Sequence, residues 1–482
     1  MRAGGHKAHK TPFAHSAKTG YSSAMASAHA STSSENTFAY WRDLADRDPE
    51  QAAGELYRRL ETTPAEERRR AIAAWPSRDE LRERFQAQAG AGEPGGGTAG
   101  LRAVPYLLKD LFDVRGELTG CSSRVLYDTG RPAEADSRVQ REMQKAGGVY
   151  CGRTHMNEFA YGLDGKNAHF GDCLNPHDPS RITGGSSSGS AWVVGKEIAP
   201  LAFGTDTGGS VRVPASYCKV FGFRRGVDDW SADGVFPLAR SFDTAGWFTA
   251  TAEDMATTLR TLWEHPEAAA EQHADSKGAG SAGGEGLWYQ PDSVPIPPEL
   301  EQAATRLAEQ LGTVRDDKAA GKLDDLLAAG TTAYNVIGSS DAYEVHKDWL
   351  DEYGSLYDPV VWALIDRGRH WSAESLEEAH IVRDELSQLM CELLTRYAFI
   401  AMPATPMLTP LHEQVNATYR SHTLQLSVPA SLAGLPALTI PVAVGPGRSG
   451  GVQIILPCEP SPRAREILGR AGLIATAAGG RY

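Results

Sequence analysis

The sequence has no hydrophobic run that approaches the roughly 20 apolar residues of a membrane-spanning helix. It is also poor in cysteine, with six in 482 residues and no C-x-x-C pair. Such sparse cysteines are typical of buried, reduced thiols rather than of a disulfide framework or a zinc site. We therefore expect a soluble, cytoplasmic protein without a metal site. The cysteines are Cys121, Cys151, Cys173, Cys218, Cys391 and Cys458.

Basic residues are scarce as well: 48 Lys and Arg stand against 61 Asp and Glu, so the formal net charge is −13. An acidic protein offers no electrostatic surface for nucleic acid or for anionic lipid, and we expect neither as a partner. Hydrophobic residues make up 41% of the chain and charged residues 23%, which is typical of globular proteins. A folded core and a small-molecule partner are the resulting expectation.

The first 34 residues contain no Asp or Glu and are rich in Ala, Ser, His and Lys, a composition that cannot bury a core. We expect a flexible tail over residues 1–36 and a single domain over 37–482. Arg2 is the only arginine of this tail, and no apolar stretch follows it, which disfavours an export signal. His6 and His9 could bind a metal ion adventitiously, but a solvated tail explains them better.

Helix and strand patterns alternate along the rest of the chain and predict an α/β fold. Charged runs predict peripheral helices over 37–90, and a Gly-, Ala- and Ser-rich stretch predicts a surface loop over 273–286. Ser375 and Glu378 could form a capping box for a long helix that ends at Tyr397. Further helices are expected over 139–146 and 300–311, and buried strands near 107–108 and over 149–151, 198–203, 398–402, 437–444 and 452–456.

Glycine and serine concentrate in two segments, Thr183–Ser190 and Gly204–Arg212, and either one alone is typical of a flexible loop. Gly185–Gly189 fits the G-x-S-x-G turn of α/β-hydrolases, but the residues before it are polar rather than an apolar strand. Ser216–Lys219 fits the S-x-x-K motif of β-lactamases, but the only K-T-G lies upstream, at Lys18–Gly20. The sequence thus disfavours both of these sites.

A third arrangement makes Ser210 the nucleophile of an acyl-transfer reaction. An apolar strand is expected shortly before it, Thr205–Gly209 is predicted to be a tight turn, and the following residues could begin a helix. Backbone N–H groups at a helix entrance point into one concavity, where they could stabilise the oxyanion of a tetrahedral intermediate. The candidates for this oxyanion hole are Thr207, Gly208, Gly209 and Ser210.

A serine hydroxyl is a poor nucleophile at neutral pH and needs a base within hydrogen-bonding reach. Lys109 lies in the apolar segment Val104–Val114, where burial could lower its pKa so that it acts as a neutral base. An ordinary surface lysine would fit the same local pattern. A second hydroxyl between Lys109 and Ser210 could relay the proton.

Taken together, the two Gly/Ser segments resemble the amidase signature family, whose hallmark is a Gly-Gly-Ser-Ser-Gly-Gly type loop followed by Gly-Thr-Asp-x-Gly-Gly-Ser-x-Arg. Other similar segments follow in the family's order, and the resemblance covers roughly residues 40 to 475. These segments are Leu108–Asp110, Thr154–Gly162, Asn175–Pro176, Phe221–Arg224, Ser241–Gly246, Ala433–Pro441 and Gly451–Pro457.

The resemblance implies a twisted mixed β-sheet flanked by α-helices, and a Ser-cisSer-Lys catalytic triad. In that triad Ser210 would attack the carbonyl carbon, Ser186 in a cis peptide would relay the proton, and Lys109 would be the base. The interval between the two serines matches the family's usual spacing and favours Ser186 over Ser187 as the relay.

The resemblance also assigns roles around the triad. Asp206 and Arg212 would support the loop as an ion pair, and Tyr161 and Gly162 would line the substrate pocket. Four positions depart from the family's pattern. Ser188 and Thr183 stand where glycine and proline are common and would change the loop, whereas His155 and Asn157 stand where Asn and Asp are common and could alter the pocket edge.

The implied activity is that of a serine hydrolase that uses no metal or other cofactor and cleaves a linear amide, or else a carbamate or an ester, through an acyl-enzyme. Phe236–Phe248 is similar to amidases that act on arylacetamides or indoleacetamides, and urethane hydrolases share the triad. Within the family, the A-type subunit of a glutamine-dependent tRNA amidotransferase is an alternative, as is an inactive scaffold. A cysteine enzyme of the nitrilase type is disfavoured because no cysteine lies beside a recognisable base.

The substrate itself cannot be derived from these motifs. Aromatic residues near Trp230 and over 334–343 and 349–371 are expected in variable loops that could shape a pocket for a bulky apolar group. Core packing would explain the same aromatics. A homodimer is the default expectation for the oligomeric state.

Overall fold

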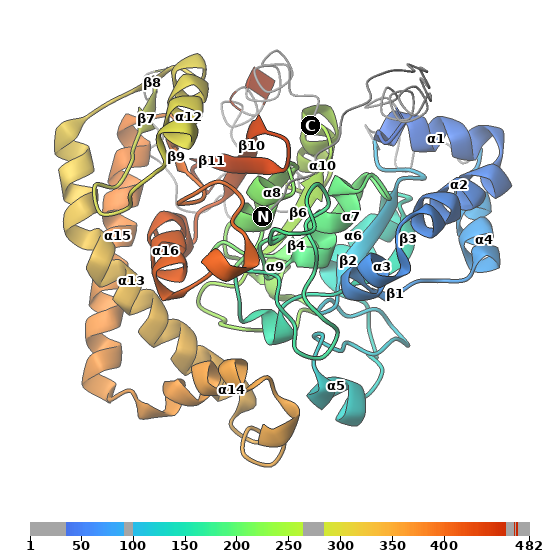
Figure 1. Ribbon diagram of the computed structural model, residues 1–482, viewed down its shortest axis with the longest axis horizontal. Coiled ribbons are helices and arrows are strands. Elements are labelled where there is room, and N and C mark those ends of the chain that lie inside the picture. The colour runs from blue at the N-terminus through green and yellow to red at the C-terminus, as the bar shows by residue number, and fades with distance from the viewer. Residues whose placement is uncertain (1–34, 91–99, 264–283, 459–466, 468, 471–482) are drawn as a thin grey trace, which may run out of the picture.

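The chain is described by a computed structural model that covers residues 35–90, 100–263, 284–458, 467 and 469–470 (Figure 1). Residues 1–34 of the predicted tail, with His6 and His9, lie outside this range, as do residues 273–283 of the predicted loop. Asn36 is buried, and its Oδ1 accepts a hydrogen bond from the indole N–H of Trp41. The tail prediction is therefore wrong at its last residue.

One mixed sheet of eleven strands forms the centre of the fold. The pairs β2–β3, β2–β4, β7–β8 and β7–β9 are parallel, and the other pairs are antiparallel. From one edge to the other the strands are β1 (Ile72–Ala74), β3 (Val149–Thr154), β2 (Pro105–Lys109), β4 (Leu201–Thr205), β6 (Ala245–Thr249), β5 (Phe221–Arg224), β10 (Ala437–Gly445), β11 (Arg448–Ile455), β9 (Ile400–Pro403), β7 (Gly286–Trp288) and β8 (Thr313–Val314).

Both faces of the sheet are covered. Along β4, Leu201 and Phe203 belong to one hydrophobic cluster, whereas Ala202 between them belongs to another. Side chains alternate across a strand, so the two clusters lie on opposite faces of the sheet. This arrangement confirms the predicted α/β fold with a mixed sheet between helices.

Four helices at the beginning of the chain pack beside the β1 edge (Figure 1). Their starts follow from local capping: Thr37 and Asp48 accept N–H bonds from the first turns of α1 and α2, and Ser77 forms a capping box with Glu80. These helices confirm the prediction for residues 37–90. They are α1 (Phe38–Arg47), α2 (Pro49–Thr62), α3 (Ala65–Ala71) and α4 (Arg78–Gln88).

Shorter helices connect the central strands and position the loops between them. The helix predicted over 139–146 is confirmed as α6, and a helix does begin shortly after Ser210, as α8. β4 begins at Leu201 rather than at Ile198, because Pro200 has no N–H to donate to a neighbouring strand. The helices are α5 (Arg124–Thr129), α6 (Arg138–Lys145), α7 (Ser188–Gly195), α8 (Arg212–Tyr217), α9 (Asp229–Ala232) and α10 (Ala252–Leu262), with the 3₁₀ helix η2 (Glu158–Ala160).

Long helices from the second half of the chain cover the opposite side of the sheet, and α16 lies between the α13–α15 pair and the strands (Figure 1). The helix predicted over 300–311 is confirmed as α12. The helices are α12 (Pro298–Gln310), α13 (Asp317–His346), α14 (Pro359–Asp366), α15 (Ala373–Arg396) and α16 (Ala417–Leu432), with the 3₁₀ helices η3 (Gly354–Leu356), η4 (Arg367–His370) and η5 (His412–Gln414).

Three sequence-based predictions need correction here. The N-cap of α15 is Ser372, whose hydroxyl accepts the Ser375 N–H, so Ser375 lies inside the helix and forms no capping box with Glu378. Residues 334–343, expected in a variable loop, lie within α13. The cysteines Cys121, Cys151, Cys173 and Cys218 are buried as expected, but Cys391 and Cys458 are exposed.

Among the described residues, no helix is both long and apolar enough to span a bilayer.

We expect the packing of the four N-terminal helices to depend on Trp41, which is fully buried and stacks on Phe85 at a centroid distance of 6.2 Å. Trp41→Ala should lower the free energy of unfolding by about 3 to 5 kcal/mol because it leaves a cavity. Ile381→Ala is the control, since Ile381 is 52% exposed on α15 and its loss should cost under about 1 kcal/mol. Urea denaturation followed by circular dichroism measures both, and equal midpoints would contradict the expectation.

Candidate active site

Lys109, at the end of β2, is fully buried. Its Nζ donates hydrogen bonds to Ser186 Oγ at 2.7 Å and to Thr205 Oγ1 at 2.9 Å. Burial lowers the pKa of Lys109 to about 7, and the nearby carboxylates of Asp243 and Asp206 oppose that shift only in part. At neutral pH roughly half of the molecules therefore carry a neutral amine that can accept a proton.

The sheet itself brings Lys109 to the turn before Ser210. Strands β2 and β4 are parallel neighbours, with Leu108 opposite Phe203, so their carboxyl ends meet at the same edge. Lys109 ends the first strand and Thr205 ends the second. The apolar strands predicted near 107–108 and before Ser210 are thus confirmed as β2 and β4. The sequence did not indicate that the hydroxyl of Thr205 accepts a hydrogen bond from Lys109.

Ser186 lies in the loop before α7, and the peptide between Gly185 and Ser186 is cis, as the family resemblance implied. The neighbouring Ser187 has a different function, because its Oγ donates to the Thr205 carbonyl and accepts the Thr205 N–H. The Ser187 N–H donates to the carbonyl of Ser210 at 3.3 Å. Hydrogen bonds therefore connect this loop to Thr205, at the end of β4, and to Ser210. Ser210 is the last residue of the turn 206–210, which is called the nucleophile turn below.

Asn157 holds the cis turn from behind. Its N–H donates to the Ser186 carbonyl, and its side-chain oxygen accepts the N–H of Gly165. A Cβ on Gly185 would lie 2.0 Å from Asn157 Oδ1, and a Cβ on Gly162 would lie 2.2 Å from Asn157 Nδ2. Gly162 therefore leaves room for the side chain of Asn157, and its place in the substrate pocket stays a prediction.

The other departures from the family pattern also lie inside the fold. His155 is buried, stacks on Phe170 and contacts the Ser122 hydroxyl through Nδ1, and burial lowers its pKa to about 4. It does not form the pocket edge that we expected there. Ser188 begins α7, and the hydroxyl of Thr183 donates to the Cys173 carbonyl.

Ser210 ends a turn that is organised around the carboxylate of Asp206. This carboxylate accepts N–H groups from Gly209 at 2.9 Å, Val211 at 3.0 Å and Arg212 at 3.3 Å. The N–H of Gly209 is therefore not free for an oxyanion, contrary to its predicted role. Among the described residues no acceptor contacts the N–H groups of the other three candidates, which are Thr207, Gly208 and Ser210.

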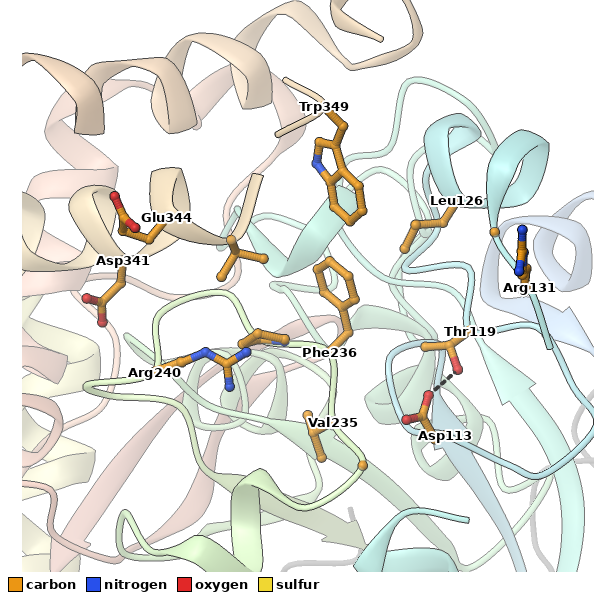
Figure 2. Close-up of a pocket in the computed structure, with 14 residues that line it drawn as sticks. Asp113, Thr119, Leu126, Arg131, Val235, Phe236, Arg240, Asp341, Glu344 and Trp349 are labelled. Atoms are coloured by element: carbon orange, nitrogen blue, oxygen red, sulfur yellow. Dashed lines mark hydrogen bonds between the residues drawn. The ribbon is translucent and has the colours of Figure 1, made fainter. Parts of the chain in front are cut away.

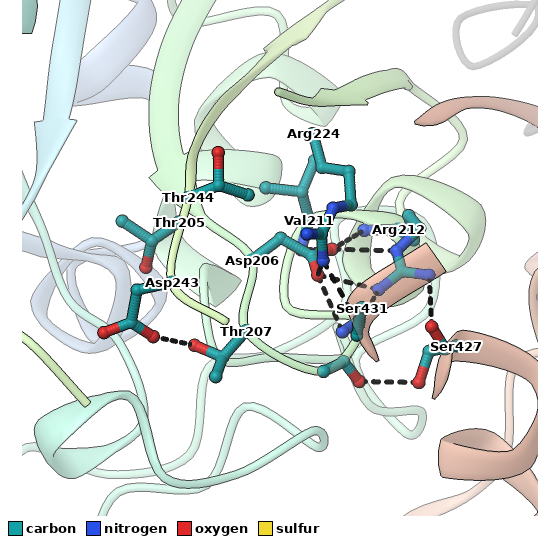
Figure 3. A network of polar contacts seen from close by, with 12 residues as sticks. Thr205, Asp206, Thr207, Val211, Arg212, Arg224, Asp243, Thr244, Ser427 and Ser431 are labelled. Atoms are coloured by element: carbon teal, nitrogen blue, oxygen red, sulfur yellow. Dashed lines mark hydrogen bonds and ion pairs between the residues drawn. The ribbon is translucent and has the colours of Figure 1, made fainter. Parts of the chain in front are cut away.

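Asp206 is fully buried between two equally buried arginines (Figure 3). Its Oδ1 lies 2.8 Å from Arg212 Nη2 and 3.1 Å from Arg224 Nη1. Burial alone would raise the pKa of Asp206, but the two guanidinium charges outweigh it and hold that pKa well below its usual range. The ion pair inferred for Asp206 and Arg212 is thus present, and Arg224 is a second cation that the sequence did not single out.

Helix α16 clamps the same turn from the other side (Figure 3). The Ser427 hydroxyl donates to the Gly208 carbonyl at 2.8 Å, and Arg212 donates to the Ser427 carbonyl at 2.9 Å. Arg212 and Arg224 both donate to the hydroxyl of Ser431. These serines are more than 200 residues from the turn in sequence, so local pattern could not identify them.

Asp243 anchors the other end of the turn. It accepts a hydrogen bond from the Thr207 hydroxyl at 2.5 Å and the N–H groups of Leu238 and Ala239 (Figure 3). Burial raises its pKa to about 6, against the lowering effects of these donors and of Lys109. Asp243 belongs to a segment that carried the family resemblance, but no local pattern assigned it a role.

A narrow pocket with a cavity volume of about 10 Å³ opens beside Thr207. That volume is close to the minimum for one water molecule, so only a small group fits without side-chain movement. Tyr161 lines this pocket, whereas Gly162 does not. The full lining is Tyr161, Thr207, Leu238, Ala239, Tyr334, Asn335, Gly338, Ser339 and Arg420.

A larger cavity of about 770 Å³ is lined by other residues of the segment 236–240, among them Phe236 and Arg240 (Figure 2). Phe236 stacks on Trp349 at its apolar centre, while Arg240, Asp341 and Glu344 give it a charged rim. None of the predicted catalytic residues lines this cavity. It is a neighbour of the site rather than the site itself.

Rival nucleophiles are occupied or unreactive. The Ser216 hydroxyl donates to the Arg212 carbonyl within its own helix, and it makes no contact with Lys219. Burial raises the pKa values of the Cys121 and Cys218 thiols well above the usual range of a cysteine, so both thiols stay protonated. Across the described part of the chain, no group of three or more His, Cys, Asp or Glu side chains could hold a metal ion.

Comparison with known proteins tests the family resemblance of the sequence. The sequence model of the family described as Amidase matches residues 55–458. The chain belongs to the amidase signature family. Amidase 1 of Arabidopsis thaliana is 30% identical over 375 residues, which are 71% of this chain and 86% of that protein. The A-type subunit of the glutamyl-tRNA(Gln) amidotransferase of Treponema pallidum is 31% identical over 412 residues, or 76% of this chain and 81% of that protein.

Solved structures agree with the fold. A crystal structure described as an amidase superimposes with a TM-score of 0.74 and 25% identity over 92% of this chain and 99% of that chain. This amidase is accordingly a hydrolase of carbon–nitrogen bonds with the α/β architecture of its family.

We expect this amidase to lose stability when the buried anion of its nucleophile turn is neutralised. Asp206→Asn leaves Arg212 and Arg224 buried without a counter-charge, which should lower the free energy of unfolding by about 3 kcal/mol or more. Asp128→Asn is the matched control, because Asp128 pairs with Arg124 on the surface and should cost under about 1 kcal/mol. Thermal unfolding of both variants measures the difference, and similar melting temperatures would refute the expectation.

Proposed function

We propose that this amidase hydrolyses a linear carboxamide through an acyl-enzyme on Ser210, with Ser186 as the proton relay and Lys109 as the base. The observation that carries the proposal is the buried Lys109 amine, 2.7 Å from Ser186 Oγ, with a pKa lowered by burial to about 7. A lysine held neutral beside a hydroxyl is a base poised for physiological pH.

The geometry suggests the following sequence of proton transfers. Neutral Lys109 takes the proton of Ser186, which takes that of Ser210, and Ser210 Oγ forms a bond to the carbonyl carbon. The N–H groups of Thr207, Gly208 and Ser210 stabilise the resulting oxyanion. The proton returns through the relay to the leaving nitrogen as the C–N bond breaks, and water then releases the acyl group by the same route.

Carbamates and esters present the same carbonyl carbon to Ser210 and are secondary candidates. The relative from Treponema pallidum is named as an amidotransferase subunit, which keeps a partner-dependent activity as a second function to test. The net charge of −13 does not favour contact with tRNA. Residence in the cytoplasm, a homodimer, and independence of cofactors, membrane and nucleic acid stay predictions.

Removal of the nucleophile should abolish turnover of acyl 4-nitroanilides and of an aryl carbamate. We expect Ser210→Ala to lower kcat/KM by about a thousandfold or more, and Ser186→Ala to do nearly the same because the two serines act as a unit. Ser216→Ala is the control: it removes the buried hydroxyl of the rival S-x-x-K motif and should retain activity. Turnover that survives in Ser210→Ala, or is lost in Ser216→Ala with the fold intact, would overturn the assignment.

The pH dependence should report Lys109. Because the neutral amine is the active form, kcat/KM for a neutral anilide should fall about tenfold per pH unit below about pH 6 and level off above about pH 8. Lys219→Met should leave this profile unchanged, since Lys219 is half-buried and has no contact with the triad. A profile that is flat from about pH 5.5 to about pH 8.5, the range over which such a base titrates, would contradict a neutral lysine as the base.

A further inference from the structure

The narrow pocket beside Thr207 contains a guanidinium group that has no carboxylate partner. Arg420 lines the pocket from α16, is half-buried, and forms no ion pair with any residue that the structure describes. A second arginine, Arg367 of η4, lies beside Tyr161 of the same pocket, and its Nε and Nη2 are buried without a hydrogen-bond partner. Neither arginine has an ion-pair partner among the described residues, and both are partly exposed to solvent.

Helix α16 fixes the position of Arg420 relative to the nucleophile turn. Ser427, on the same helix, donates to the Gly208 carbonyl. Arg420 precedes Ser427 by seven residues, so it lies on the same face of α16, two turns nearer the amino end. The helix that clamps the nucleophile turn therefore also holds the guanidinium group over the adjoining pocket.

The two carboxylates nearest the turn already accept hydrogen bonds from other groups, although only Asp206 has cationic partners. Asp206 is taken by Arg212 and Arg224, and Asp243 is taken by Thr207 and two backbone N–H groups. Burial raises the pKa of Tyr161, and the charges of Arg367 and Arg420 oppose that rise, so both cations act on one hydroxyl of the pocket.

Tyr334 adds a polar group directly above the turn. Its hydroxyl has no hydrogen-bond partner among the residues described, and a Cβ on Gly208 would lie 2.2 Å from it. The ring is fixed by stacking on Phe242 at 5.2 Å. The hydroxyl of Tyr334 thus fills the space beside Gly208 and is an available donor to a group in the pocket.

We propose that Arg420 binds a carboxylate of the substrate, with Arg367 and Tyr334 as further donors, so that the preferred substrates are amides whose acyl part carries a carboxylate a few bonds from the scissile carbonyl. This inference rests on the proposed function, because it takes Thr207–Ser210 as the place of the carbonyl. A guanidinium group matches a carboxylate in shape and charge. The cavity of about 10 Å³ has room for about one water molecule, so a carboxylate enters it only when the lining side chains move.

The test compares two 4-nitroanilides of similar shape. One is the monoanilide of succinic acid, which carries a carboxylate, and the other is the anilide of 4-methylpentanoic acid, in which a branched alkyl group replaces it; malonic and glutaric monoanilides extend the series. The proteins are the wild type, Arg420→Met, Arg420→Lys, and the control Arg383→Met, whose arginine lies on the surface of α15 beside Asp384.

We expect wild-type kcat/KM to be higher for at least one acid than for the alkyl anilide by about tenfold or more, since a hydrogen-bonded charge contributes on that scale. Arg420→Met should remove this preference and leave the alkyl anilide within about twofold, which a general loss of folding would not do. Arg420→Lys should restore part of it, and Arg383→Met should match the wild type. An equal preference in wild type and Arg420→Met, or no preference for any acid, would overturn the inference.

Failure of the inference is distinguishable from failure of the proposed function. Turnover of the alkyl anilide that depends on Ser210, without preference for any acid, refutes the carboxylate site alone. If neither class of anilide is hydrolysed, the proposed function fails for these amides. The carboxylate site is then tested by calorimetry, which measures binding of the acid anilides to Ser210→Ala with and without Arg420→Met. Binding that Arg420→Met weakens about tenfold supports it, and binding that is absent or unchanged by Arg420→Met overturns it.

Discussion

The active site depends on one buried carboxylate. Asp206 lies between Arg212 and Arg224 with no exposure to solvent, and it also accepts three backbone N–H groups of the nucleophile turn. Taking three charges out of water is costly, and the geometry offsets that cost only while each charge keeps its partner. Loss of any one of these charged partners would therefore destabilise the turn that presents Ser210.

The pKa of Lys109, the proposed base, is lowered by its position in the sheet rather than by a specific neighbour. Lys109 ends a strand at the centre of a sheet that is covered on both faces, so its amine has hydroxyl partners but no carboxylate in direct contact. Desolvation is the main cause of its lowered pKa. The parallel pairing of β2 and β4 thus supplies both the proximity of Lys109 to the turn and the environment that makes it a base.

Helix α16 connects the nucleophile turn with the narrow pocket beside it. This helix contacts the nucleophile turn through Ser427 and Ser431, and its Arg420 lines the pocket beside that turn. A substrate anchored by Arg420 would therefore be placed relative to the oxyanion donors by a single rigid element. The segment 236–240, which Asp243 ties to Thr207, contributes residues to this pocket and to the larger aromatic cavity.

Short sequence segments were sufficient to predict the family, the α/β class and the three residues proposed for the triad, because their pattern is readable without the fold. Helices and strands were also predicted wherever the apolar period was clear. The α15 cap was expected three residues late, at Ser375 rather than Ser372, and part of α13 was expected to be a loop, since local composition does not report tertiary packing. Only the folded chain shows that the Gly209 N–H is bonded to Asp206 and that Arg420 lines the pocket. It also shows which distant residues surround the candidate site: Thr205, Arg224, Asp243, Ser427 and Ser431. The physical reason is that hydrogen bonding and desolvation of these groups arise between segments up to 241 residues apart, as Arg212 and Gln453 are.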